Sequence, residues 1–312
     1  MQALLVIAVA LALGYATTLL PWRDILTALR STDPLLLGLA AALQLGVIPF
    51  WVWQWGLIAS ALTSVRWRGI MAAVALSIGA KVSMSGLAGV SAGVLALKSH
   101  GGLTYSQAGA LMSLDQFFAL ATKLLVLLLA LMLAPLPRAI HLVALSLLVL
   151  GVVMVVALVF ARHTQGHLDA LASRYAGMMS RLISQVAIFL RDAARVGTAR
   201  VVLGGLGLAV VKRAFEIAAA LAVLVACGLA PDPVAALLVV AAVSVTTLVP
   251  VMPANLGTHP AGVFAALVLV GAPADLALAA GLLHHAVVLA TSIAVALLGI
   301  VATGARSRAP SR

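Results

Sequence analysis

Long apolar runs separated by short polar segments extend over the whole chain. Runs of membrane-spanning length lie at about residues 3–20, 35–61, 106–133, 139–161, 201–229 and 275–301. Two further apolar segments are interrupted: residues 67–97 by Lys81 and a flexible run, and residues 234–271 by the proline-bounded turn 250–260. The pattern predicts an all-α polytopic membrane protein, with about six full spans and two segments that do not cross as single helices.

The two halves of the chain are similar to each other. Residues 72–129 and 241–298 align without a gap at an offset of 169, and 19 of the 58 positions are identical. Composition alone would match roughly a tenth of the positions in so apolar a chain, so we interpret the halves as copies of one unit. Repeat A covers about 35–133 and repeat B about 204–302. In transporters built from repeats, the substrate site lies where the copies meet.

The basic residues predict how the spans are oriented. Arginines are concentrated in the linker 162–200 and in the tail 304–312, which marks both as cytoplasmic. The segment 234–271 must then begin and end on the far side, and the segment 67–97 on the cytoplasmic side. Each is predicted to be a re-entrant helical hairpin. The two copies therefore form an inverted repeat within one transmembrane domain, residues 1–303.

Both termini are predicted to be cytoplasmic, in a bacterial inner membrane. No basic residue precedes the run 3–20 and further spans follow it, so we expect a first transmembrane helix there rather than a signal peptide. In the linker 162–200, apolar residues recur at helical spacing beside arginines. This is typical of an amphipathic helix lying on the membrane surface, although a plain connector fits equally well.

Composition excludes several classes of function. The chain is 64% hydrophobic and only 9% charged, which is far from a soluble globular protein. The net charge is +11, but the basic residues cluster in the segments between spans, as in the pattern that orients membrane proteins. We therefore expect no nucleic-acid partner. No paired carboxylates, zinc-protease motif, phosphate-binding loop or cysteine cluster is present, and Cys227 stands alone in an apolar run. We therefore expect no enzyme activity, no cofactor and no metal.

Ionisable residues within the spans are the first candidates for a substrate pathway, because charge inside a membrane is rare and costly. Lys81 and Asp115 are expected to pair or to share a wet cavity; a purely structural ion pair is the alternative. The repeat places Asp115 opposite His284 and Gln116 opposite His285. A histidine there would bind a phosphate or relay a proton, or would serve only in packing.

A second group of candidates lies in repeat B. Lys212 and Glu216 are four residues apart and are expected to pair, which would leave Arg213 for a lipid phosphate. These three residues either line the pathway or contain an ion pair whose opposite charges cancel and that only contacts neighbouring protein. The turn 250–260 would expose Asn255, Thr258 and His259, and a short helix starting near Ala261 would direct its positive end into the cavity. An ordinary extracellular loop is the alternative.

The turn Pro253-Ala254-Asn255-Leu256-Gly257-Thr258-His259 and the later Leu282-Leu283-His284-His285 carry a family resemblance. Together with the layout of spans, they resemble the transmembrane region of lysylphosphatidylglycerol synthases and related stand-alone flippase-like proteins. The chain departs from that family at four places, one of which is the lack of the arginine usual near residues 92–96. Pro260 stands where glutamate is common, Ala254 replaces a glycine, and Asp115-Gln116 replaces an Asp-Arg pair.

The resemblance implies a lipid flippase that moves a lipid with a polar headgroup, anionic or lipid-linked, across the inner membrane. Members of the family are thought to move aminoacylated phospholipids, lipid-linked sugars and hopanoid-related lipids. An intramembrane lipid-modifying enzyme and a non-transporting partner of such an enzyme are the alternatives. Membrane lipids are the expected partners, and both a homo-oligomer and a complex with a lipid-modifying enzyme stay open.

Overall fold

The computed structural model describes residues 30–83, 86–134, 195–247 and 253–304, together with the isolated positions 27, 142, 145, 149 and 192. In these ranges the chain forms eight α-helices and no strand. Four helices are long: α3 (Pro34–Ser60), α6 (Tyr105–Leu133), α10 (Ala199–Ala226) and α13 (Ala274–Gly304). Each coincides with one predicted span. The predicted spans 3–20 and 139–161, most of the linker 162–200 and the tail lie outside the described residues.

Three of the long helices, α3, α6 and α13, are long and apolar enough to cross a membrane. The fourth, α10, is 28 residues long but has Lys212, Arg213 and Glu216 near its middle. At about 1.5 Å per residue, a helix of this length exceeds the roughly 30 Å hydrocarbon core of a bilayer. Together with the sequence pattern, these helices identify a helical membrane protein.

The helix starts follow from local sequence. Asp33 caps α3 by accepting a 2.8 Å hydrogen bond from Leu35 N, and Pro34 occupies the first turn. Thr104 and Gln107 form a reciprocal capping box at the start of α6. Asp232 and Pro233 form the same Asp-Pro start at the short helix Pro233–Thr246. Unpaired backbone N–H groups at each start are thereby satisfied.

The two interrupted segments each fold into a pair of short helices. The first hairpin consists of α4 (Trp67–Ser83) and α5 (Gly86–Ala96), followed by the π-helical turn η1 (Leu97–Gly101). The second hairpin consists of α11 (Pro233–Thr246), the 3₁₀ turn η2 (Pro253–Asn255) and α12 (Thr258–Leu269). None of these helices reaches the about 20 residues that a span requires. Both segments are thus helical pairs, as predicted.

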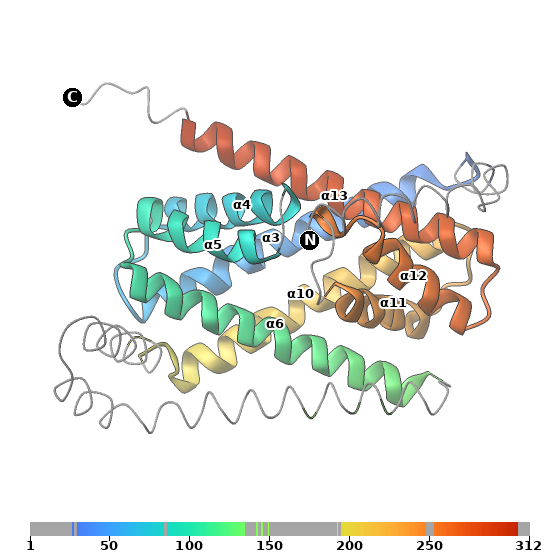
Figure 1. Cartoon of the computed structure of the whole chain (residues 1–312), viewed down its shortest axis with the longest axis horizontal. Coiled ribbons are helices and arrows are strands. Elements are labelled where there is room, and N and C mark those ends of the chain that lie inside the picture. The colour runs from blue at the N-terminus through green and yellow to red at the C-terminus, as the bar shows by residue number, and fades with distance from the viewer. Residues whose placement is uncertain are drawn as a thin grey trace, which may run out of the picture.

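Figure 1 shows how the two halves are arranged. The helix order long, short, short, long is the same in both halves, α3 to α6 and α10 to α13. Corresponding long helices run in opposite directions, and the two hairpins approach the centre from opposite ends. At the centre, η2 of the second hairpin contacts α4 of the first. The long helices α3 and α10 pack against each other along their length.

Among the described residues the apolar core forms two clusters, one around each hairpin, and each draws residues from both halves. One surrounds the first hairpin and includes Trp55, Ile70 and Phe118. The other surrounds the second hairpin and includes Val239, Val263 and Leu267. Glycines allow close packing between the halves, since a Cβ on Gly205 would lie 2.2 Å from the Phe118 ring.

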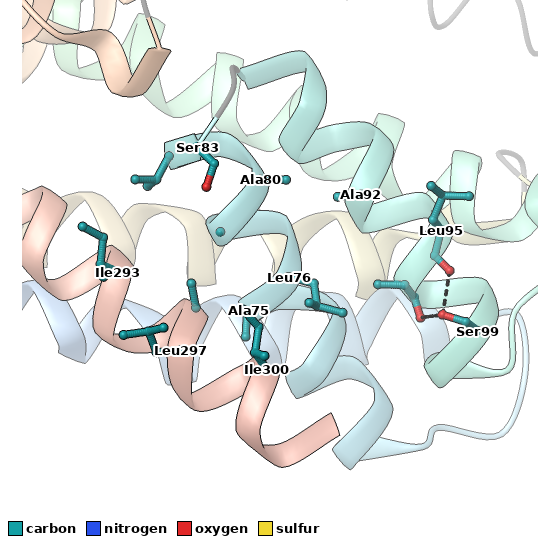
Figure 2. A pocket seen from close by; sticks show the side chains of 14 residues that line it. Ala75, Leu76, Ala80, Ser83, Ala92, Leu95, Ser99, Ile293, Leu297 and Ile300 are labelled. Atoms are coloured by element: carbon teal, nitrogen blue, oxygen red, sulfur yellow. Dashed lines mark hydrogen bonds between the residues drawn. The ribbon is translucent and has the colours of Figure 1, made fainter. Parts of the chain in front are cut away.

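A groove of about 520 Å³ lies between the first hairpin and α13, beside the direct contact of α4 with α13 (Figure 2). We call it the lateral groove. Its walls come from α4, from α5 and η1, and from α13, and include Gly79, Ala80, Ser83, Ala92, Ile293 and Leu297.

Candidate functional site

The ionisable residues predicted for the pathway lie in one neighbourhood at the centre of the molecule. Lys81 on α4 is within electrostatic range of Glu216, Arg213 and Asp115. Lys212 on α10 is within range of the same groups. We call Lys81, Asp115, Lys123, Lys212, Arg213 and Glu216 the central cluster. Its members come from α4, α6 and α10, so the first hairpin and one long helix from each half all contribute.

Asp115 is buried, with 3% of its surface exposed. Its carboxylate accepts hydrogen bonds from Gln54 Nε2 at 3.4 Å and from Gln116 Nε2 at 3.3 Å. The predicted direct pair with Lys81 does not form in the described structure; Lys81 contributes only a longer-range attraction. Because Gln54 projects from α3, the amide contact joins α3 to α6.

Two tryptophans complete the surroundings of Asp115. The indole groups of Trp51 and Trp55 face its carboxylate. Neither indole Nε1 reaches hydrogen-bonding geometry with any described residue, and Gln54 Oε1 is also buried without a partner there. Both indole N–H groups are nevertheless directed at an acceptor, the Asp115 carboxylate, and help to stabilise its negative charge.

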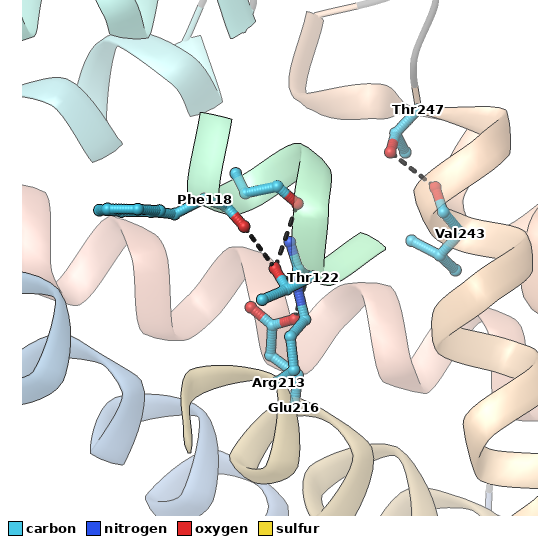
Figure 3. Close-up of polar contacts among 7 residues, drawn as sticks. Phe118, Thr122, Arg213, Glu216, Val243 and Thr247 are labelled. Carbon is cyan, nitrogen blue, oxygen red and sulfur yellow. Dashed lines mark hydrogen bonds and ion pairs between the residues drawn. The ribbon is translucent and has the colours of Figure 1, made fainter. Parts of the chain in front are cut away.

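Arg213 and Glu216 form the ion pair of α10 (Figure 3). Arg213 Nε also donates to Thr122 Oγ1 on α6 at 3.4 Å. The predicted Lys212–Glu216 pair is therefore wrong. Both spacings place the side chains on one helix face, but the contact with Thr122 draws the guanidinium towards Glu216. Lys212 instead lies 5.3 Å from the centre of the Trp51 ring, in a cation–π contact with α3.

The remaining lysines add positive charge without an ion pair among the described residues. Lys81 is largely exposed, although it lies within range of the cluster. Lys123 is half-buried on α6, about two helical turns beyond Asp115 and within range of Arg213 and Glu216. With formal charges, the central cluster has four cations and two anions. The excess is two positive charges, which favours an anionic ligand.

Three histidines form a second polar group beside the cluster. His259 Nε2 and His284 Nδ1 share a 2.8 Å hydrogen bond. His285 stacks on the His259 ring with centroids 4.7 Å apart, and its Nε2 bonds to Ala254 O at 3.0 Å. His284 is within electrostatic range of Glu216, which links the histidines to the central cluster. Both histidines of the pair 284–285 are thus buried and engaged in contacts.

The turn at the tip of the second hairpin has unusual backbone. Ala254 and Asn255 have φ values of 55° and 56°, in the left-handed region that favours glycine. The left-handed conformation explains why glycine suits the position that Ala254 occupies. The Asn255 carbonyl accepts a bond from Thr258 Oγ1 at 3.2 Å, and the helix begins at Thr258 rather than near Ala261. Asn255 itself is half-buried.

Sequence reasoning missed Gln54, Trp51, Trp55 and Thr122. Gln54 was detectable, because it is one of only two glutamines inside a predominantly apolar span. The tryptophans are four residues apart and so share one helix face, but nothing in the sequence indicates that this face meets Asp115. Within the described residues, no group of three or more His, Cys, Asp or Glu side chains is arranged to hold a metal ion.

The model of one protein family, the lysylphosphatidylglycerol synthase TM region, matches residues 2–299. The chain is therefore a member of this family of membrane proteins, and the predicted resemblance is confirmed. No curated protein and no solved structure shows a significant match to the chain. The family name links this kind of membrane domain to phospholipid metabolism.

Proposed function

We propose that the protein is a transporter, or flippase, for a lipid with an anionic headgroup. The observation that carries the proposal is the excess of two positive charges in the central cluster, at the point where the two halves meet. Charge at membrane depth is retained where it binds a substrate or forms a pathway. The headgroup would pass through the cluster while the apolar chains stay in the membrane.

The corrected ion pair changes which cation would hold the headgroup. Arg213 is engaged by Glu216 and Thr122. Lys81 and Lys212 form no ion pair with a described residue, so these two are the better candidates for a phosphate contact.

We further propose that the halves form an inverted repeat. The equal order of helices and the opposite directions of the corresponding long helices support it (Figure 1). The glycines Gly102 and Gly271, which match in the repeat, have φ values of 78° and 85° and precede corresponding helices. In such a design, access to the two faces of the membrane alternates as one repeat moves against the other around a fixed site.

Transport on this proposal involves no chemical step. The cluster binds and releases the headgroup by charge and hydrogen bonding, and we expect movement to follow gradients or to run as facilitated scrambling. The arginine distribution supports a bacterial inner membrane with both termini in the cytoplasm. Membrane lipids are the partners we propose.

Reconstitution tests this function directly. Vesicles of phosphatidylcholine with a fluorescent phosphatidylglycerol would be prepared with and without the protein, and the exposed label reduced chemically. We expect the protein to give rapid loss of the inner-leaflet signal. Native mass spectrometry of gently extracted protein should also detect a bound anionic lipid. Equal rates with and without protein, and only zwitterionic lipid bound, would exclude the proposal.

A further inference from the structure

The lateral groove is almost entirely apolar. Among its 14 lining residues only Ser83 and Ser99 have polar side chains. Its volume of about 520 Å³ lies within the range of about 300–1,000 Å³ that is usual for ligand sites. Figure 2 shows α4 and α5 on one side of it and α13 on the other. A ligand that fills the groove must therefore be largely hydrocarbon.

Small residues form the floor of the groove and larger ones its rim. Ala75, Ala96 and Ala296 are at most 9% exposed. Leu95 and Leu297 stand at the rim and are 56% and 57% exposed. The groove is thus a trough that opens on the outer surface of the helices, where a membrane protein meets lipid.

One end of the groove leads to the central cluster. Lys81 lies between Ala80 and Val82 in the sequence, and both of these neighbours line the groove. Ser83 also lines this end. Lys81 is at the same time within electrostatic range of Asp115 and the α10 ion pair. Lys81 itself does not line the groove, so the apolar groove ends one residue away from a member of the central cluster.

The other end leads to a second basic region. Ser99 lines this end, and its neighbours Lys98 and His100 are exposed. The Lys98 ammonium lies 3.8 Å from the centre of the Tyr105 ring, at the start of α6. The groove thus runs between exposed basic residues at the mouth of the first hairpin and the basic residues at its tip.

We propose that the lateral groove binds an acyl chain of the same anionic phospholipid whose headgroup occupies the central cluster. The proposal rests on the proposed function. An apolar trough that ends on positive charge matches an amphipathic molecule with an anionic head. A groove that only accommodates bulk lipid would not distinguish one headgroup from another, and this difference decides the test.

The first experiment uses photoactivatable lipids with a diazirine on the acyl chain. The protein would be reconstituted with such a phosphatidylglycerol, or with a phosphatidylcholine that has the same chains, and the adducts mapped by mass spectrometry. We expect a several-fold excess of phosphatidylglycerol adducts on Leu95 and Leu297. The exposed Leu203 on α10 should react equally with both lipids. Equal labelling of the groove by both lipids would overturn the proposal.

The second experiment fills the groove. Ala92→Trp should abolish the selective adducts and slow phosphatidylglycerol transport about tenfold, whereas Leu203→Trp should change neither. If Ala92→Trp does not fold, Ala80→Leu narrows the same groove with a smaller side chain. Selective adducts that survive in a folded groove-filling variant would contradict the proposal.

A soluble headgroup, glycerophosphoglycerol, separates this inference from the proposed function. The wild type and Ala92→Trp should bind it equally, and Lys81→Gln/Lys212→Gln should bind it weakly. If the wild type does not bind it, the headgroup site itself fails. If the wild type binds it but the groove labels without selectivity, only the acyl-chain inference fails.

Discussion

The two helical hairpins correspond in the sequence but differ in packing. In the second hairpin, α11 is buried continuously from Ala235 to Ala241, and α12 packs between it and α13. In the first hairpin, α4 packs closely on both α5 and α13, but the lateral groove stays open where these three helices meet. The same chain order has therefore produced one tightly enclosed hairpin and one with an open side.

On the proposed function, this difference would give the two hairpins different roles. The enclosed hairpin holds its tip by hydrogen bonds, since His259 bonds to His284 and His285 bonds to Ala254 O. The open hairpin has an exposed lysine near its tip, Lys81. We interpret the second hairpin as a fixed wall and the first as the side on which lipid enters.

The largest expected effect concerns the orientation of the hairpins. Replacing Cys227 by alanine gives a background without cysteine, in which Ser64→Cys and Ala230→Cys mark the loops before the first and second hairpins. A membrane-impermeant maleimide applied to intact spheroplasts should label position 230 and not position 64. Labelling of both positions from the same side would refute the inverted repeat.

The next largest effect is expected on transport, in a comparison of variants at the repeat-matched residues Asp115 and His284. Asp115→Asn retains its shape but removes a negative charge from a cationic cluster, so an anionic headgroup should be held more tightly and released more slowly. We expect transport to fall about tenfold. His284→Gln changes no formal charge and should reduce transport less. Full transport by a normally folded Asp115→Asn would show that this carboxylate has only a structural role.

A third comparison sets a crowded glycine position in the second hairpin against an open one at the start of α5. A Cβ on Gly262 would lie 2.6 Å from Thr246 Oγ1 and 3.2 Å from the Val243 backbone, whereas a Cβ on Gly86 would meet nothing within 4 Å. Gly262→Ala should destabilise the protein by about 1–3 kcal/mol. Gly86→Ala should be neutral or slightly stabilising. Thermal unfolding in detergent measures both, and equal melting temperatures would argue against the tight second hairpin.

The smallest expected effect is a difference in stability between variants of two threonines at corresponding positions. Thr122 and Thr291 correspond in the repeat, and each donates to the carbonyl four residues before it. Only Thr122 also accepts a bond from Arg213 among the described residues. Thr122→Val should lower stability by about 1 kcal/mol and Thr291→Val by less than half of that. Equal shifts in melting temperature would show that the Arg213–Thr122 hydrogen bond does not contribute specifically to the contact between the halves.

The sequence was sufficient for the helices and hairpins, because span length, interruption and repeat are local or periodic signals. The four described spans and both interrupted segments became helices and helical pairs where predicted. It was also sufficient to select the candidate residues of the cluster, because charge inside an apolar run is conspicuous.

Pairing among those residues was not predictable in the same way. Lys212 and Arg213 are both spaced to reach Glu216, and only the neighbours on other helices, Trp51 and Thr122, decide between them. The lateral groove was equally hidden. It depends on which faces of α4 and α13 meet, and alanine and glycine leave no polar pattern to show that.

The central claim is that positive charge at the meeting point of the halves moves an anionic headgroup, and lipid movement in reconstituted vesicles tests it most directly. Fluorescent phosphatidylglycerol and phosphatidylcholine would be compared for the wild type, for Lys81→Gln/Lys212→Gln, and for Arg213→Gln/Glu216→Gln, which keeps the net charge. We expect the wild type to prefer phosphatidylglycerol, the lysine variant to lose the preference, and the charge-neutral variant to retain most of it. A lysine variant that moves phosphatidylglycerol as fast as the wild type would contradict the account.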